Sequence, residues 1–193
     1  MAKSHFRLAV LISGDGSNLQ AILNAIESAT LNARVALVIS NRADANGLNR
    51  AKKAGVPFAV ISPVKGQSRE EYDERLLETL HSIEPDLIVL AGFMRILSAL
   101  FVEQYSGKII NIHPSLLPAY KGLNTHQRVL DAGERYHGVT VHFVTDQLDA
   151  GKMIIQSRIE ILAKDDAQSL QQRIHTEEHI IYPRAIQWLS ESG

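Results

Sequence analysis

The sequence predicts a single α/β domain, a doubly wound and mostly parallel sheet with helices on both faces. Two observations point to this fold class. Several segments of strand length are apolar at almost every position, which is typical of parallel strands buried on both sides. Segments with helical spacing separate these strands, so that each strand has a helix to carry the chain back. With 193 residues, 45% of them hydrophobic, the chain suits one core, and we expect residues 1–193 to form one domain.

The first half of the chain alternates regularly between strands and helices. Ser68 is a favourable N-cap residue and Glu71 follows three positions later, which is the spacing of a capping box. The expected strands are 7–13, 33–40, 57–62, 86–93 and 108–112, and the expected helices are 18–29, 43–55 and 68–85. Strands and helices that alternate in this way form an open, Rossmann-like sheet.

After Gly122 the pattern changes. Residues 138–144 alternate between apolar and polar, and the strand-like segment 152–161 follows too closely for a crossover helix. We therefore expect an antiparallel strand near the C-terminal end. The last element, 166–189, carries apolar residues near helical spacing, and we expect Pro183 to kink or restart it.

Charge and composition exclude several classes of function. The formal net charge is −1, without a block of like charges, which argues against nucleic acid or an anionic membrane as the main partner. The absence of cysteine excludes disulfides, thiolate metal sites and cysteine nucleophiles. The apolar run 8–12 is too short for a signal-peptide core, and no run approaches the ~18 apolar residues of a membrane span. We expect a cytoplasmic protein, a monomer or weak homodimer, that binds small molecules.

A glycine-containing loop, SGDGSN at 13–18, joins the first strand to the first helix. Glycines at such a position let backbone N–H groups and a helix N-terminus approach an anion, typically a phosphate. Position 19 is Leu rather than a third glycine and no Lys follows, so neither the dinucleotide fingerprint nor a Walker loop is complete. The alternative is a tight turn in which Ser17 or Asn18 caps the helix.

Asn111 and His113 end the fifth strand, two residues apart, so both side chains leave the same face. The C-terminal ends of parallel strands are where open α/β sheets bind ligands. Pro114 and Pro118 prevent a helix directly afterwards. An amide donor beside an imidazole suits an oxyanion and a proton transfer. The alternative is a buried pair that satisfies loop backbone groups.

Asp149 lies between the two late strands, beside Ala150 and Gly151. A turn at this point can direct its carboxylate inward, where it would favour a protonated imidazole and fix its tautomer. An acidic surface turn is the alternative, and both remain open at this point.

The segment HTEEH, 175–179, matches the H-x-x-E-H pattern of inverted zinc proteases. Residues four apart share a helix face, but a catalytic zinc needs a third protein ligand. We interpret the segment as a polar helix face and expect no metal.

Five segments occur in the order and at the spacing of one known family: LISGDGSNLQAI, LAGFMRILS, IINIHPSLLPAYKG, VHFVTDQLDAG and EEHIIYP. From about Arg7 to Trp188 the chain resembles the phosphoribosylglycinamide formyltransferases, also called glycinamide ribonucleotide transformylases. This formyltetrahydrofolate-dependent family transfers the formyl group of 10-formyltetrahydrofolate to the glycinamide amine of a ribonucleotide in purine biosynthesis.

The resemblance implies a role for each matching residue. Asn111, His113 and Asp149 correspond to the catalytic trio, and Glu178 would reach the ribose. The backbone of Gly16, Ser17 and Asn18 would hold the substrate phosphate. The folate would be bound by Arg69, Met94, Arg95, Ile96, Leu97 and Asn111, with the 144–149 loop closing on the pteridine.

One residue departs from the family pattern. Asp15 lies between the two loop glycines, where the family carries an uncharged or basic residue. A carboxylate aimed at the phosphate would weaken binding by up to ~1 kcal/mol if exposed, so we expect this side chain to point to solvent.

The resemblance implies direct attack of the amine on the formyl carbon, without a covalent enzyme intermediate. No cysteine is present and Ser115 has no evident base partner. A methionyl-tRNA formyltransferase should carry a further C-terminal domain and a basic surface, and a formyltetrahydrofolate hydrolase an extra segment before the first strand. A non-catalytic nucleotide-binding module is the remaining alternative.

Overall fold

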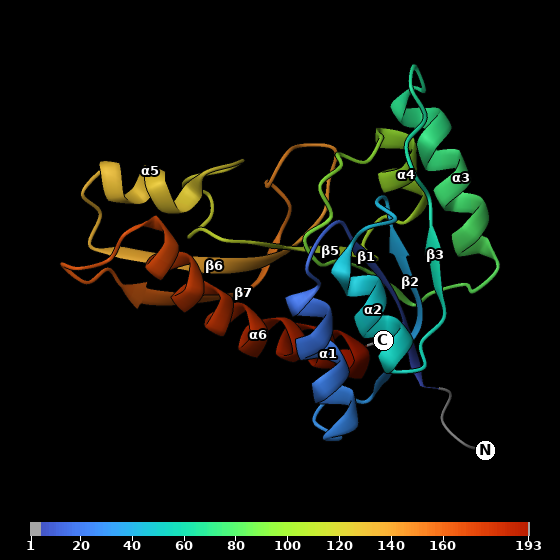
Figure 1. Cartoon of the computed structure of the whole chain (residues 1–193), viewed down its shortest axis with the longest axis horizontal. Coiled ribbons are helices and arrows are strands. Elements are labelled where there is room, and N and C mark those ends of the chain that lie inside the picture. The colour runs from blue at the N-terminus through green and yellow to red at the C-terminus, as the bar shows by residue number, and fades with distance from the viewer. Residues whose placement is uncertain (1–4, 193) are drawn as a thin grey trace.

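The computed structural model describes residues 5–192, which form a seven-stranded sheet with helices on both faces (Figure 1). The strands are β1 Phe6–Ile12, β2 Ala33–Ser40, β3 Phe58–Val60, β4 Leu87–Leu90, β5 Ile109–His113, β6 Tyr136–Phe143 and β7 Met153–Glu160. The helices are α1 Ser17–Glu27, α2 Asn46–Lys53, α3 Arg69–His81, α4 Ala99–Gln104, α5 Thr125–Asp131 and α6 Ala167–Ser192.

The strand order is β3-β2-β1-β4-β5-β6-β7. The first five strands in this order pair in parallel, whereas β6 is antiparallel to both β5 and β7. The chain leaves β1 toward β2 and later returns to β4 on the other side of β1, which makes a topological switch point between β1 and β4. The predicted fold class and the antiparallel C-terminal portion are confirmed.

Both faces of the central strands are buried. On β1, Leu8, Val10 and Ile12 belong to a core cluster with residues of α1, α2 and α6. Ala9 and Leu11 face the opposite side and pack with residues of α3 and α4. This arrangement explains why the sequence of the strand is apolar at every position.

A local sequence signal accounts for the start of α3. At the start of α3, Glu71 donates its backbone N–H to the Ser68 hydroxyl, and the Ser68 N–H donates to the Glu71 carboxylate, so the predicted capping box is confirmed. The short helices α4 and α5 were not predicted, because each has too few residues to show a helical period. None of the helices between residues 5 and 192 is long and apolar enough to cross a membrane.

Helix α6 corrects one expectation. Of the two expected effects of Pro183, a kink or a restart of the last helix, the restart is wrong, because α6 continues through this residue from Ala167 to Ser192. Tyr182, Ala185 and Ile186 are buried on either side of it, and their packing offsets a proline cost of about 3 kcal/mol. The Tyr182 hydroxyl also donates to the Leu90 carbonyl at 2.8 Å, which ties α6 to the end of β4.

Candidate active site

The candidate site lies at the carboxyl ends of β1, β4 and β5, beside the topological switch point. The glycine loop follows β1, and β5 ends at His113. The Met94 backbone N–H donates to the Ser13 hydroxyl at 2.8 Å, which links the segment after β4 to the glycine loop. Segments that are far apart in the sequence therefore meet at one edge of the sheet.

The glycine loop presents backbone donors at the start of α1. Gly16 has a φ of 76°, a left-handed backbone, and forms the N-cap of α1 without a side-chain cap. No described residue accepts a hydrogen bond from the backbone N–H groups of Asp15, Gly16, Ser17 or Asn18. Such a row of N–H groups at a helix N-terminus is suited to an anion.

Glu178 of α6 lies beside this loop. The Asn18 side-chain amide donates to its carboxylate at 2.8 Å, across 160 positions of the sequence, and both residues are buried. Burial raises the pKa of Glu178, while the hydrogen bond from Asn18 and the nearby His175 act in the opposite direction. The Asn18 amide oxygen has no partner among the described residues. A polar group of a ligand can therefore bind to this pair.

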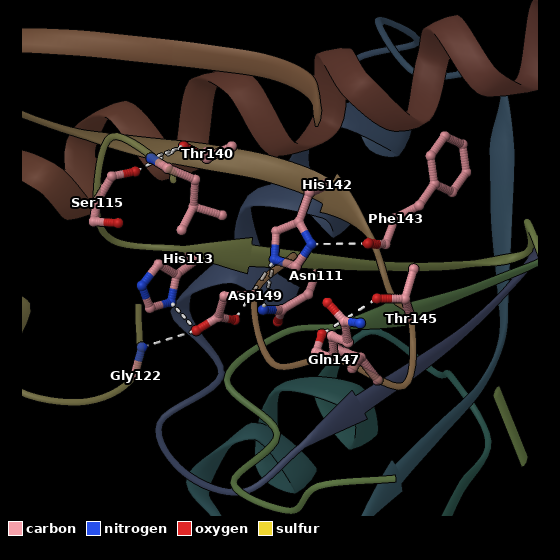
Figure 2. A network of polar contacts seen from close by, with 12 residues as sticks. Asn111, His113, Ser115, Gly122, Thr140, His142, Phe143, Thr145, Gln147 and Asp149 are labelled. Atoms are coloured by element: carbon pink, nitrogen blue, oxygen red, sulfur yellow. Dashed lines mark hydrogen bonds and ion pairs between the residues drawn. The ribbon is translucent and has the colours of Figure 1, made fainter. Parts of the chain in front are cut away.

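Asp149 faces His113 from the loop between β6 and β7 (Figure 2). The carboxylate lies 3.4 Å from His113 Nδ1, and both side chains are less than a tenth exposed. Asp149 has a left-handed backbone, with a φ of 47°, and its carboxylate accepts the Gly122 backbone N–H at 2.9 Å. The other ring nitrogen of His113, Nε2, lies 2.9 Å from the carbonyl oxygen of Tyr120.

His142 is part of the same cluster, although it was not among the predicted site residues. Figure 2 shows the Asp149 carboxylate between the two imidazoles, with His142 Nε2 at 3.7 Å. His142 lies opposite Asn111 in the antiparallel pair of β5 and β6, and its Nε2 is 3.3 Å from the Asn111 amide nitrogen. A histidine within the apolar run VTVHFV was the only signal in the sequence.

The hydrogen bonds of His142 define its tautomer. Its Nδ1 lies 2.8 Å from the Phe143 carbonyl, which can only accept, so Nδ1 carries the proton and Nε2 accepts from the Asn111 amide. Burial lowers the pKa of His142, in agreement with a neutral ring. A neutral His142 therefore orients the Asn111 amide and leaves its second N–H to point elsewhere.

The residues expected to bind folate differ in their exposure and in their contacts. Met94 and Ile96 expose 70% and 57% of their surface, whereas Leu97 is buried. The Arg95 guanidinium lies over the Tyr72 ring at 3.9 Å, and its Nε is buried without a partner among the described residues. Tyr72 belongs to α3, the helix that begins at Arg69.

Two further large apolar side chains are exposed, each next in sequence to Asp149 or to Gly122, whose N–H donates to Asp149. Leu148, in the expected closing loop 144–149, precedes Asp149, and Leu123 follows Gly122. Exposed apolar side chains around a polar cluster are typical of a ligand-binding surface. Ser115 is fully buried and its hydroxyl donates to the Ala119 carbonyl at 2.7 Å, which is not the setting of an activated nucleophile.

A groove of about 810 Å³ lies between α1 and α6. It includes Ser17, Arg50 and His179 but none of the trio. In α6 the His175 and His179 rings stack with centroids 6.3 Å apart, while Glu178 turns toward Asn18. Across residues 5–192, no three His, Cys, Asp or Glu side chains are grouped as metal ligands.

Asp15 is exposed, but its side chain does not simply point to solvent. Its side chain is 61% exposed, yet its carboxylate accepts from the Asn46 amide at 3.0 Å and from the Arg50 guanidinium at 2.8 Å. The hydrogen bond from Asn46 is the largest cause of a lowered Asp15 pKa, and Arg50 adds to it. The carboxylate is thus ionised and paired with α2.

Comparison with known proteins gives one consistent result. Residues 6–186 match the family model described as formyl transferase. The chain is 47% identical over 184 residues to phosphoribosylglycinamide formyltransferase of Escherichia coli, covering 95% of this chain and 87% of that protein. It is also 51% identical over 185 residues to the trifunctional purine biosynthetic protein adenosine-3 of Drosophila melanogaster, where the match covers 14% of the longer protein.

Solved structures agree with these sequence matches. The phosphoribosylglycinamide formyltransferase of Coxiella burnetii superposes with a TM-score of 0.93 at 51% identity, over 98% of this chain and 89% of the other. Glycinamide ribonucleotide transformylase 1 of Symbiobacterium toebii gives a TM-score of 0.94 at 44% identity, and the match covers 97% of this chain and 89% of the other.

Proposed function

The chain belongs to the formyl transferase family, and from this premise we propose that it transfers the formyl group of 10-formyltetrahydrofolate to the amine of glycinamide ribonucleotide. Its homologues are phosphoribosylglycinamide formyltransferases of purine biosynthesis. The observation that carries the assignment of roles is the meeting of Asn111, His113 and Asp149 at the end of β5. A cytoplasmic location remains a prediction from the sequence.

In the proposed reaction the ribonucleotide amine, as the free base, attacks the formyl carbon. A nitrogen–carbon bond forms and the carbonyl electron pair moves to oxygen, which gives a tetrahedral oxyanion. The second N–H of the Asn111 amide and a protonated His113 donate to this oxyanion. The bond between the formyl carbon and the folate nitrogen then breaks, and the proton lost by the attacking amine reaches the folate nitrogen with the help of His113.

Asp149 supports the charged histidine in this scheme. Its carboxylate is 3.4 Å from His113 Nδ1, where it can accept a hydrogen bond from this nitrogen and stabilise positive charge on the ring in the transition state. The Tyr120 carbonyl holds Nε2 at 2.9 Å. We infer that the formyl oxygen takes the place of this carbonyl when the substrates bind, so the 119–124 segment shifts during the cycle.

Two sides of the site are assigned to the two substrates. The N–H groups of residues 15–18 would bind the phosphate and Glu178 the ribose, since the glycine loop and the buried carboxylate adjoin each other. The segment 94–97, with Arg69, would bind the folate, because the exposed apolar side chains of Met94 and Ile96 can pack against the face of a flat heteroaromatic ring.

The test is an absorbance assay of formyltetrahydrofolate deformylation, with and without glycinamide ribonucleotide. Loss of the formyl group only when the ribonucleotide is present, together with formylated ribonucleotide as product, is expected. Equal deformylation without the ribonucleotide would indicate a hydrolase, and no turnover in either case would contradict the proposal.

A further inference from the structure

The contacts of Arg50 have no part in the reaction described above. This residue of α2 makes three hydrogen bonds to the glycine loop and to α1. Its Nε donates to the Asp15 backbone carbonyl at 2.8 Å, one terminal nitrogen donates to the Asp15 carboxylate at 2.8 Å, and the other reaches the Gln20 amide oxygen at 3.3 Å. The Arg50 side chain is 28% exposed.

The same face of α2 holds the loop at two further points. Asn46, one turn before Arg50, donates to the other oxygen of the Asp15 carboxylate at 3.0 Å. The Gly47 backbone N–H donates to the Gly14 carbonyl at 3.1 Å. Gly16 packs so closely here that a Cβ on it would lie 2.6 Å from the Gly47 Cα.

These bonds determine where the loop N–H groups point. In a trans peptide the C=O and the following N–H point in opposite directions. The Gly14 and Asp15 carbonyls are both bound by α2, so the N–H groups of Asp15 and Gly16 point away from that helix. Like the N–H groups of Ser17 and Asn18 at the start of α1, they have no acceptor among the described residues.

The charges in this contact also matter. Asp15 alone would place a negative charge in a loop that is to receive a phosphate. Paired with Arg50, the two side chains are neutral together, and the repulsion is offset. The guanidinium therefore binds Asp15 of the loop and is not a free cation for the ligand.

We propose that Arg50 is a positioning residue for the ribonucleotide phosphate, and that Asp15 and Arg50 act as one neutral unit. Arg50 fixes the orientation of the Asp15–Gly16 peptide and compensates the Asp15 carboxylate, while the phosphate itself binds to backbone N–H groups. This inference rests on the proposed function, because it concerns the phosphate end of the same site.

Three variants separate the two parts of this role, with steady-state kinetics for both substrates. Arg50→Ala leaves the carboxylate uncompensated and the peptide free to turn, so the KM for glycinamide ribonucleotide should rise about tenfold or more, with the folate KM and kcat within about twofold. Asp15→Asn removes the negative charge and keeps one acceptor oxygen, and Arg50 can still donate to the backbone carbonyl of residue 15, so the ribonucleotide KM of this variant should stay within about threefold of the parent. The double variant Asp15→Asn/Arg50→Ala should have a KM several-fold below that of Arg50→Ala alone.

Arg135→Ala is the matched control, since Arg135, directly before β6, forms an exposed ion pair at 3.2 Å with Glu160 at the end of β7. It should leave the ribonucleotide KM unchanged. Thermal unfolding of each variant verifies that it is folded. If Arg50→Ala changes both KM values equally, or if the double variant is no better than Arg50→Ala, the inference is wrong. A parent protein without formyl transfer would instead refute the proposed function. In that case, calorimetric titration of glycinamide ribonucleotide into the parent and the Arg50 variants would still test whether Arg50 positions the phosphate.

Discussion

Asp149 is the residue on which the polar groups of the site converge. One carboxylate oxygen accepts the Gly122 N–H and faces His113, while the other faces His142. Its left-handed backbone, at a φ of 47°, turns the side chain inward. Because His142 orients Asn111 and Asp149 faces His113, the proposed oxyanion donors are held by neighbours rather than by the strand alone.

The roles within the trio predict a graded loss of activity. Asn111→Ala and His113→Ala each remove a donor to the oxyanion, and kcat should fall on the order of a hundred- to a thousand-fold. Asp149→Asn keeps the size of the side chain and removes its charge, so kcat should also fall, whereas the KM of each substrate should change much less.

Single-turnover formyl transfer, measured beside equilibrium binding of both substrates, tests this prediction. Asp131→Asn is a suitable control, since this exposed acidic residue at the end of α5 accepts a hydrogen bond from Gln127 and has no part in the proposed site. Unchanged turnover in Asp149→Asn would remove the carboxylate from the mechanism.

At the scale of elements, the glycine loop is built by contact between β1, α1 and α2. Gly16 needs its φ of 76° and its close approach to Gly47, two requirements that only glycine meets. Gly14 has neither, since a Cβ there would meet nothing within 4 Å. The two glycines of the loop are therefore not equivalent.

This difference predicts the outcome of two alanine substitutions. Gly16→Ala should displace the loop from α2 and raise the KM for the ribonucleotide at least tenfold, with little change in the KM for folate. Gly14→Ala should have a much smaller effect. Equal effects of Gly16→Ala on both substrates would contradict the assignment of phosphate to this loop.

A second contact between elements joins α5 to β6. His126 Nδ1 lies 3.0 Å from His137 Nε2, with the rings edge to face. Burial is the largest cause of a pKa lowered to about 4 in both residues. Both rings are therefore neutral in the folded protein at pH 7.

This pair predicts a loss of stability in mild acid. Between pH 6.5 and 4 the unfolded chain binds protons at these two positions that the folded protein does not, so the free energy of unfolding should fall as the pH decreases through this range. Denaturant unfolding at pH 7 and at pH 5 measures the change. In His126→Gln/His137→Gln the decrease should be smaller, and an equal decrease would assign it to other groups.

At the scale of the whole molecule, the predictable part of the fold was the part with strong local periodicity. The central strands and α3 follow from apolar runs and a capping box. The site residues that the sequence analysis did not predict reach the site through contacts between segments that are far apart in the sequence. His142 enters the site through the register of β6 against β5, and Arg50 reaches Asp15 because α2 lies beside the loop after β1. Local sequence patterns predict neither the strand register nor the position of α2 beside the loop.

The proposed ribonucleotide site also connects the first and the last helix of the chain. Asn18 belongs to the first helix and Glu178 to the last, and their 2.8 Å hydrogen bond connects α1 with α6. A ligand that binds both residues binds the folded protein only, because unfolding separates them. At a concentration of 100 times its Kd, such a ligand adds about 2.7 kcal/mol to the free energy of unfolding.

We therefore predict that saturating glycinamide ribonucleotide raises the Tm by about 5 to 10 °C, given roughly 2–4 °C per kcal/mol for a chain of this size. Glu178→Ala should lose most of this increase, because the buried ribose contact is removed, while the increase caused by folate remains. Glu177→Ala is the control, since the neighbouring Glu177 carboxylate accepts from Ser157 on β7 and not from Asn18. Differential scanning calorimetry with each ligand measures the shifts. If Glu178→Ala keeps the full Tm increase caused by the ribonucleotide, the ribose binds elsewhere. If Glu177→Ala also loses this increase, the effect depends on α6 as a whole rather than on the Glu178 carboxylate.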